Sequence, residues 1–135
     1  MKRYLCDGIV KGATHQRNGL PCQDSKKIVE ISEDIVIIAV ADGHGSEKCP
    51  RSDRGSTIAV NTFCEVMKNY LQSYGSDENG LSNLITFLNR EGDMRFAQDI
   101  CEEWQARVKQ SYYKNKADGM LDEDGNIKWP AVYSL

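Results

Sequence analysis

The sequence lacks the features that mark nucleic-acid-binding and membrane proteins. Its 17 basic and 20 acidic residues are scattered and leave a net charge of −3, so there is no basic stripe to contact a phosphate backbone. No apolar run approaches the length of a membrane span, and the first seven residues are too charged for a signal peptide. We therefore expect no nucleic-acid partner, no membrane partner and a cytoplasmic location.

The five cysteines include no CxxC pair, which argues against a zinc knuckle or a dithiol redox motif. Because their number is odd and their spacing is wide, we expect free thiols, most of them buried. Cys22 lies next to a proline and two residues before Asp24. We interpret Cys22 as a packing residue rather than a reactive thiol.

The composition that remains is that of a soluble globular protein. The chain has 135 residues, of which 40% are hydrophobic and 27% charged. That is enough for one real core, and two domains would be crowded. The sequence therefore predicts a single domain over residues 1–135.

Hydrophobic periodicity predicts both strands and helices. The expected strands are a short one at Ile9-Val10, a second over residues 26–31 and an unbroken β-branched run over residues 35–41. The last run should be buried on both faces at the centre of the sheet. The expected helices cover residues 52–74, a stretch from about 81, and residues 93–112, with Ser52 or Asp53 able to cap the first.

Two polar stretches flank these strands. The loop over residues 13–24 contains His15, Arg17 and Asp24. The second stretch, Asp42-Gly43-His44-Gly45-Ser46, ends the β-branched run abruptly. Its two glycines allow positive φ and a close approach of the backbone to a ligand. We therefore expect the carboxylate of Asp42 to lie at the end of the buried strand, at the edge of the core.

The order of these motifs resembles the start of the PP2C (PPM) family of metal-dependent protein serine/threonine phosphatases. Residues 12–15 and 18–25 look like the bacterial-type branch, and Asp42-Gly43-His44-Gly45 matches the most recognisable tetrad of the family. The resemblance covers nearly the whole chain in order and spacing. It implies an α+β fold, the N-terminal portion of an α-β-β-α sandwich in which helices flank antiparallel sheets. It also implies hydrolysis of phosphoserine and phosphothreonine esters in a phosphorylated protein substrate.

The same resemblance implies roles for individual residues. Asp42 would bridge two Mn²⁺ or Mg²⁺ ions, since hard cations prefer oxygen ligands, and Gly43 would add its backbone carbonyl. Asp24 would orient bound water close to the metals. His44 would protonate the leaving oxygen. Gln23 is neutral where many eukaryotic members have a glutamate.

The residues available to bind phosphate differ from the family pattern. Many members place an arginine upstream of the first aspartate, and counting back from Asp24 puts Gly19 at that position. His15 and Arg17 are the cations available upstream, and a guanidinium matches phosphate geometry well. We therefore expect His15 and Arg17 to bind the substrate phosphate.

The two further aspartates that complete the metal cage in the family have no counterpart after Asp42. We therefore expect the chain to be the C-terminally truncated front part of a phosphatase domain, whose partner is the missing C-terminal half. The alternative is a pseudophosphatase, or an interaction module that binds phosphoproteins without turnover.

Two other readings fit the sequence less well. An α/β-hydrolase site at His44-Gly45-Ser46 lacks the G-x-S-x-G elbow. The acidic stretch over residues 121–129 does not fit a calcium-binding loop. If Gly125 occupied the sixth position of such a loop, the first position would be Met120, which offers calcium no carboxylate. A turn at Asp124-Gly125 is the better interpretation.

Overall fold

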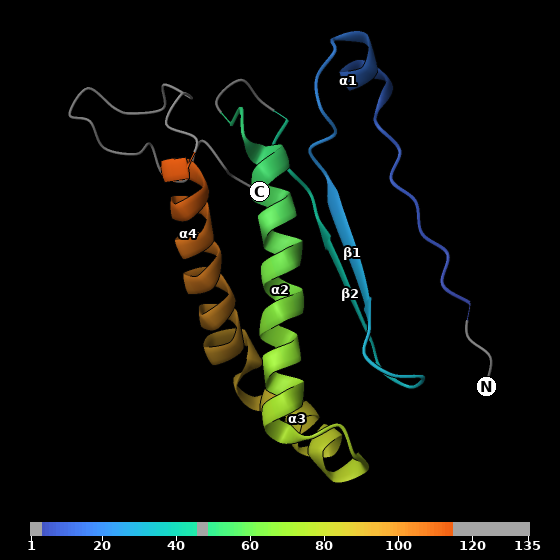
Figure 1. Cartoon of the computed structure of the whole chain (residues 1–135), viewed down its shortest axis with the longest axis vertical. Coiled ribbons are helices and arrows are strands. Elements are labelled where there is room, and N and C mark those ends of the chain that lie inside the picture. The colour runs from blue at the N-terminus through green and yellow to red at the C-terminus, as the bar shows by residue number, and fades with distance from the viewer. Residues whose placement is uncertain (1–3, 46–48, 115–135) are drawn as a thin grey trace.

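The computed structural model describes residues 4–45 and 49–114. Its elements follow in the order α1 (Ala13–Arg17), β1 (Ser25–Glu30), β2 (Val36–Ala41), α2 (Ser52–Tyr74), α3 (Glu78–Glu91), the π-helical turn η1 (Gly92–Phe96) and α4 (Ala97–Lys114). Figure 1 shows α2 lying along the paired strands, with α4 beside α2 and α3 at its far end. Helices combined with an antiparallel hairpin confirm the expected α+β class.

The strands β1 and β2 form an antiparallel pair with one covered face. In their register Val29 lies opposite Ile37, and Ile28 opposite Ile38. Ile37 is buried, but Ile38 is 59% exposed and Val40 is 80% exposed, because successive side chains of a strand point to opposite faces. The prediction that residues 35–41 are buried on both faces is therefore wrong within the described part of the chain.

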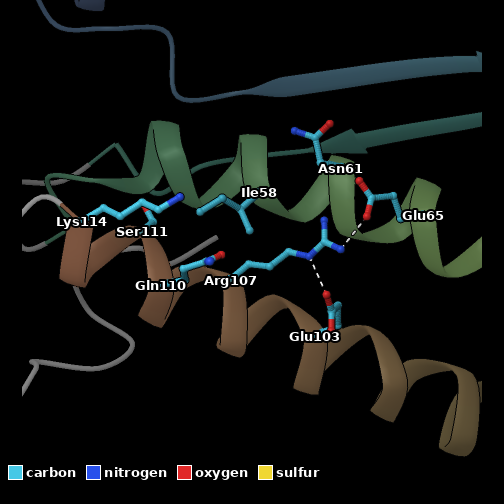
Figure 2. A pocket seen from close by; sticks show the side chains of 8 residues that line it. All are labelled: Ile58, Asn61, Glu65, Glu103, Arg107, Gln110, Ser111 and Lys114. Carbon is cyan, nitrogen blue, oxygen red and sulfur yellow. Dashed lines mark hydrogen bonds and ion pairs between the residues drawn. The ribbon is translucent and has the colours of Figure 1, made fainter.

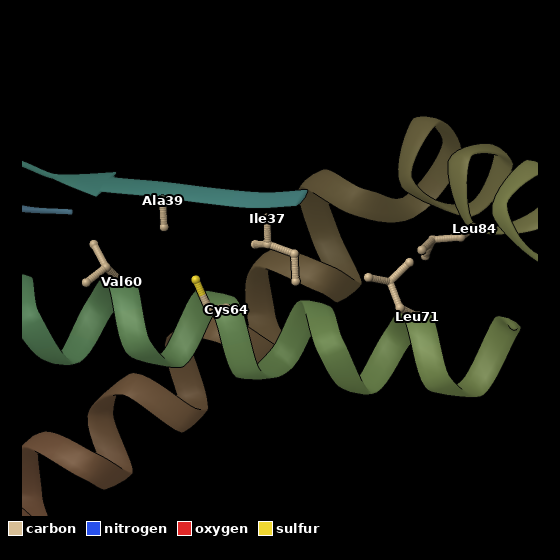
Figure 3. Close-up of a cluster of buried hydrophobic side chains, with 6 residues drawn as sticks. All are labelled: Ile37, Ala39, Val60, Cys64, Leu71 and Leu84. Atoms are coloured by element: carbon tan, nitrogen blue, oxygen red, sulfur yellow. The ribbon is translucent and has the colours of Figure 1, made fainter. Parts of the chain in front are cut away.

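The main core lies between the covered face of the hairpin and α2 (Figure 3). Its buried members are Ile37, Ala39, Val60, Cys64, Leu71 and Leu84. Burial raises the pKa of the Cys64 thiol, as desolvation disfavours a thiolate. All five cysteines are free as expected, but Cys6 and Cys101 are exposed and only Cys49 and Cys64 are buried. The expectation that most of them are buried is therefore wrong.

The N-terminal region departs most from the sequence prediction. Ile9 and Val10 form no strand, and Val10 is 88% exposed. Two apolar residues are too few to hold a ladder without a partner strand. The loop predicted over residues 13–24 instead begins with α1, a five-residue helix.

The helices agree better with the prediction, and α2 has the predicted bounds. Its N-cap is Arg51, and no side chain caps it, so the capping role predicted for Ser52 or Asp53 is wrong. Helix α3 begins three residues before 81, because the Asp77 side chain caps it by accepting from the Gly80 N–H at 3.0 Å. The turn predicted at Asp124-Gly125 lies outside the described residues. In the part of the chain that is described, no helix is long and apolar enough to cross a bilayer.

Helix α4 is fixed to α2 by polar and apolar contacts. The Trp104 indole N–H donates to the Gly55 carbonyl at 3.1 Å, and Val108 and Tyr112 are buried against Ile58. Beside this contact lies a groove of about 540 Å³ between the two helices (Figure 2). Arg107 crosses it and donates to Glu65 at 2.5 Å and to Glu103 at 2.7 Å.

The ion pair between Arg107 and Glu65 should make stability depend on pH. The hydrogen bond from Arg107 lowers the pKa of Glu65, so the pair contributes above the unfolded pKa of about 4.3 and is lost as pH falls through the folded pKa. Glu65 is about half exposed, so we expect Glu65→Gln to cost only about 0.5 kcal/mol of unfolding free energy at pH 7. Urea unfolding at pH 7 and near pH 3 measures this, and the cost should disappear at the lower pH. Glu33→Gln, in the exposed hairpin turn, is the control; an equal cost at both pH values would contradict the account.

Candidate functional site

Two carboxylates leave the hairpin at the same end. Ser25 pairs with Ala41 as the last rung of the sheet, so the adjoining residues Asp24 and Asp42 lie just beyond the neighbouring ends of β1 and β2. Both are exposed. Both also line one groove of about 560 Å³, which lies between residues 5–9 and the face of the sheet that α2 does not cover. The structure thus brings together the two aspartates singled out in the sequence.

Gly43 lies where the two motif segments touch. Its backbone N–H donates to Asp24 Oδ1 at 3.4 Å. A Cβ at Gly43 would lie 2.3 Å from the carbonyl oxygen of Gln23, closer than any side chain can approach. Among the described glycines only Gly19 and Gly75 have positive φ. Gly43 is therefore required by the close approach of the Gln23 backbone and not by a positive φ.

Gly45 makes a second close contact with the loop before β1. A Cβ at Gly45 would lie 2.7 Å from Gln23 Oε1 and 2.9 Å from His15 Nε2, so these two side chains converge on it. Gln23 is 8% exposed, and its Oε1 has no hydrogen-bond partner among the described residues. His15 therefore lies at the site, whereas Arg17 is exposed at the end of α1.

The first turn of α2 holds both motif segments. Ser52 Oγ donates to the carbonyl of His44 at 2.7 Å, and Ser56 Oγ donates to the carbonyl of Gln23 at 2.5 Å. Sequence reasoning missed these contacts. The one signal for them was a pair of serines spaced by one helical turn directly after the Asp-Gly motif.

The donor chemistry of this site fits a divalent cation. Asp24 and Asp42 offer carboxylate oxygens and Gly43 a backbone carbonyl, which are the ligands that Mg²⁺ and Mn²⁺ prefer. A small hard cation keeps several waters and needs only one or two carboxylates. In the described ranges, no group of three or more His, Cys, Asp or Glu side chains is arranged to hold a metal ion. The described donors therefore suit one largely hydrated ion rather than a dehydrated cage.

The sequence matches a known protein family. The family model for protein phosphatase 2C matches residues 11–124, which include every site residue above. The chain belongs to the protein phosphatase 2C family. No curated protein and no solved structure matches it.

Membership of the protein phosphatase 2C family confirms the resemblance on which the fold expectation rested. The match begins just before α1 and runs beyond the end of α4. Both motif segments and the helices that cover the hairpin therefore belong to the family domain. The roles of individual side chains remain predictions.

Proposed function

We propose that the protein is a metal-dependent phosphatase that hydrolyses phosphoserine and phosphothreonine esters in phosphorylated proteins. The observation that carries this proposal is the joining of Asp24 to the Asp42-Gly43 segment through the 3.4 Å contact from the Gly43 N–H. In a member of the protein phosphatase 2C family, this arrangement supports Asp24, Asp42 and Gly43 as the residues that hold Mn²⁺ or Mg²⁺.

The proposed chemistry divides between cation and protein. A bound divalent cation supplies Lewis-acid chemistry, which lowers the pKa of water and neutralises charge on the phosphoryl group. Asp42 holds negative charge at the end of β2, and Asp24 keeps its carboxylate oriented through the Gly43 N–H. His44, exposed beside Gly43, donates a proton to the seryl or threonyl oxygen as its bond to phosphorus breaks.

Phosphate binding is proposed for the cations of α1. His15 supports this role because its imidazole lies against Gly45, next to the acidic motif. Arg17, two residues later and exposed, adds a guanidinium that can approach the phosphate oxygens of a bound substrate. Together they would offset the negative charge of Asp24 and Asp42 that a phosphate must approach.

The proposal is tested by phosphate release from a phosphothreonine peptide with Mn²⁺, with Mg²⁺ and with EDTA. We expect release with either cation and none with EDTA. Restoring Mn²⁺ after EDTA should restore the rate, because chelation removes only the cation. If the rate with EDTA equals the rate with Mn²⁺, the proposed chemistry is wrong.

A second candidate is a phosphoprotein-binding module without turnover. It is favoured by the small number of carboxylates, since no group of three or more His, Cys, Asp or Glu side chains among the described residues is arranged to hold a metal ion. The peptide experiment separates the candidates. Binding of the phosphothreonine peptide without any phosphate release, at saturating Mn²⁺, would support the module and exclude the enzyme.

The proposed role of His44 predicts an effect that depends on the leaving group. His44→Gln should slow hydrolysis of phenyl phosphate about tenfold more than hydrolysis of p-nitrophenyl phosphate, because a poor leaving group depends more on general-acid assistance. Steady-state rates on the two esters measure the ratio. Equal slowing of both esters would remove His44 from the proton-donor role and leave the cation site unaffected.

A further inference from the structure

The first turn of α2 contains two serine side chains that solvent does not reach. Ser52 and Ser56 are both 0% exposed, and they are one helical turn apart on the same face of α2. A buried hydroxyl costs free energy unless it finds a partner. Here each hydroxyl donates to a main-chain carbonyl of a different motif segment. Ser52 donates to the carbonyl of His44 at 2.7 Å, and Ser56 donates to the carbonyl of Gln23 at 2.5 Å.

Ser56 belongs to a short chain of hydroxyl groups. Ser25 Oγ lies 2.8 Å from Ser56 Oγ and 3.0 Å from Thr57 Oγ1. Thr57 donates its own proton to the Asp53 carbonyl at 2.8 Å. Ser25 can donate to Ser56, which leaves the Ser56 proton for an acceptor. Besides Gln23, that proton has the Asp53 carbonyl within its own helix at 3.0 Å. The shorter contact is the one that leaves the helix.

The carbonyl that Ser56 holds is the one that packs on Gly43. A Cβ at Gly43 would lie 2.3 Å from that oxygen and 2.9 Å from its carbon. A shift of the Gln23 peptide would therefore move Asp24 relative to the Gly43 N–H, whose contact with Asp24 Oδ1 is already long at 3.4 Å. The hydroxyl of Ser56 thus contacts the peptide group that packs between the two acidic segments.

Helix α4 also contacts the first turn of α2. The indole N–H of Trp104 donates to the carbonyl of Gly55, and Gly55 is buried between the two serines. The turn is thus held against rotation about the axis of α2. A rigid support of this kind is what a site needs if its ligands are to be held before the cation binds.

We propose that Ser52 and Ser56 are positioning residues that clamp the Gln23-Asp24 and Asp42–Gly45 segments to α2 and thereby set the affinity of the site for a divalent cation. The proposal rests on the proposed function, because the cation site is part of it. It adds two residues that bind neither metal nor phosphate.

Calorimetric titration with Mn²⁺ tests the clamp without any need for turnover. Ser56→Ala should weaken Mn²⁺ binding about tenfold, the scale of losses when a group that orients a metal ligand is removed. In the metal-free protein, the amide of Gly43 should also exchange its hydrogen faster. The matched control is Ser73→Ala on the same helix, which removes a hydroxyl that donates to the Asn69 carbonyl at 2.9 Å far from the site. It should bind Mn²⁺ like the wild type.

The outcomes separate the clamp from the proposed function. If the wild type binds Mn²⁺ and Ser56→Ala binds it equally well, even with a lower free energy of unfolding, the clamp is wrong and the cation site stands. If the wild type binds no Mn²⁺, the proposed cation site itself is wrong and the clamp fails with it. Should Ser56→Ala not fold, Ser52→Ala carries the test, since it frees only the His44 carbonyl, and wild-type affinity in that variant would overturn the proposal.

Discussion

Asp42→Asn should reduce Mn²⁺-dependent hydrolysis of a phosphothreonine peptide on the order of a thousandfold. Losses of this size follow the removal of one group on which charge stabilisation in the transition state depends. Asparagine keeps the shape of the side chain but removes its charge, so the proposed cation site would lose one of its two carboxylates. Because Asp42 is exposed, the free energy of unfolding should change by less than about 0.5 kcal/mol.

Asp34→Asn is the matched control for this substitution. Asp34 is also an exposed aspartate next to a strand, but it lies in the turn that joins β1 to β2, at the opposite end of the hairpin (Figure 1). Its variant should hydrolyse the peptide at the wild-type rate. A rate for Asp42→Asn within a few fold of this control would show that the carboxylate at the end of β2 has no part in the reaction.

Gly43→Ala should impair folding and hydrolysis together. The new Cβ would meet the Gln23 carbonyl at 2.3 Å, and a main-chain atom cannot rotate away as a side chain can. Overpacking of this kind costs about 1–3 kcal/mol. Relieving it separates Asp24 from Asp42, and a misplacement of about 1 Å can slow a reaction about a hundredfold. Urea unfolding and peptide hydrolysis measure the two effects.

Two other glycines serve as controls for the Gly43 prediction. Gly8→Ala meets nothing within 4 Å and should leave both the unfolding free energy and the rate near wild type. Gly45→Ala meets the ends of the Gln23 and His15 side chains, which can rotate, so it should destabilise the fold less than Gly43→Ala. Equal stability of the Gly8 and Gly43 variants would mean that the two motif segments are not packed as described.

The regular elements were predictable because each has a clear hydrophobic period. The helix over residues 52–74 was predicted with the bounds that α2 has. The range predicted for β1 is shifted by one residue, and the range predicted for β2 begins one residue early. These signals come from the chain's own alternation of apolar and polar residues. The same rule could not tell whether β2 is covered on one face or two, since a continuous apolar run such as residues 35–41 fits both.

The local details were less predictable because they depend on contacts between distant segments. The five residues of α1 form too short a helix to show a period. The π-helical turn η1 joins α3 to α4 without a break, although it begins with Gly92, a residue type that commonly ends a helix. Such turns accommodate an extra residue within a helix, which only the packing of the two helices determines.

The residues of the candidate site were also predictable only in part. The sequence motifs identified Asp24, Asp42 and Gly43, but the reason for Gly43 lies in the backbone of Gln23, about twenty residues earlier in the chain. The contact made by Ser56 was equally unpredictable from the sequence, because its acceptor, the Gln23 carbonyl, is 33 positions away. No periodicity or turn rule links such pairs, so the support of the site became visible only with the fold.

Asp24 and Asp42 are proposed to bind one divalent cation between them. This can be measured by titrating the metal-free protein with Mn²⁺ and following the electron paramagnetic resonance signal of the free ion. We expect the wild type and Asp34→Asn to remove Mn²⁺ from solution, whereas Asp24→Asn and Asp42→Asn should each bind it much more weakly. If both site variants bind Mn²⁺ as the wild type does, or if the wild type binds none, Asp24 and Asp42 do not form a cation site.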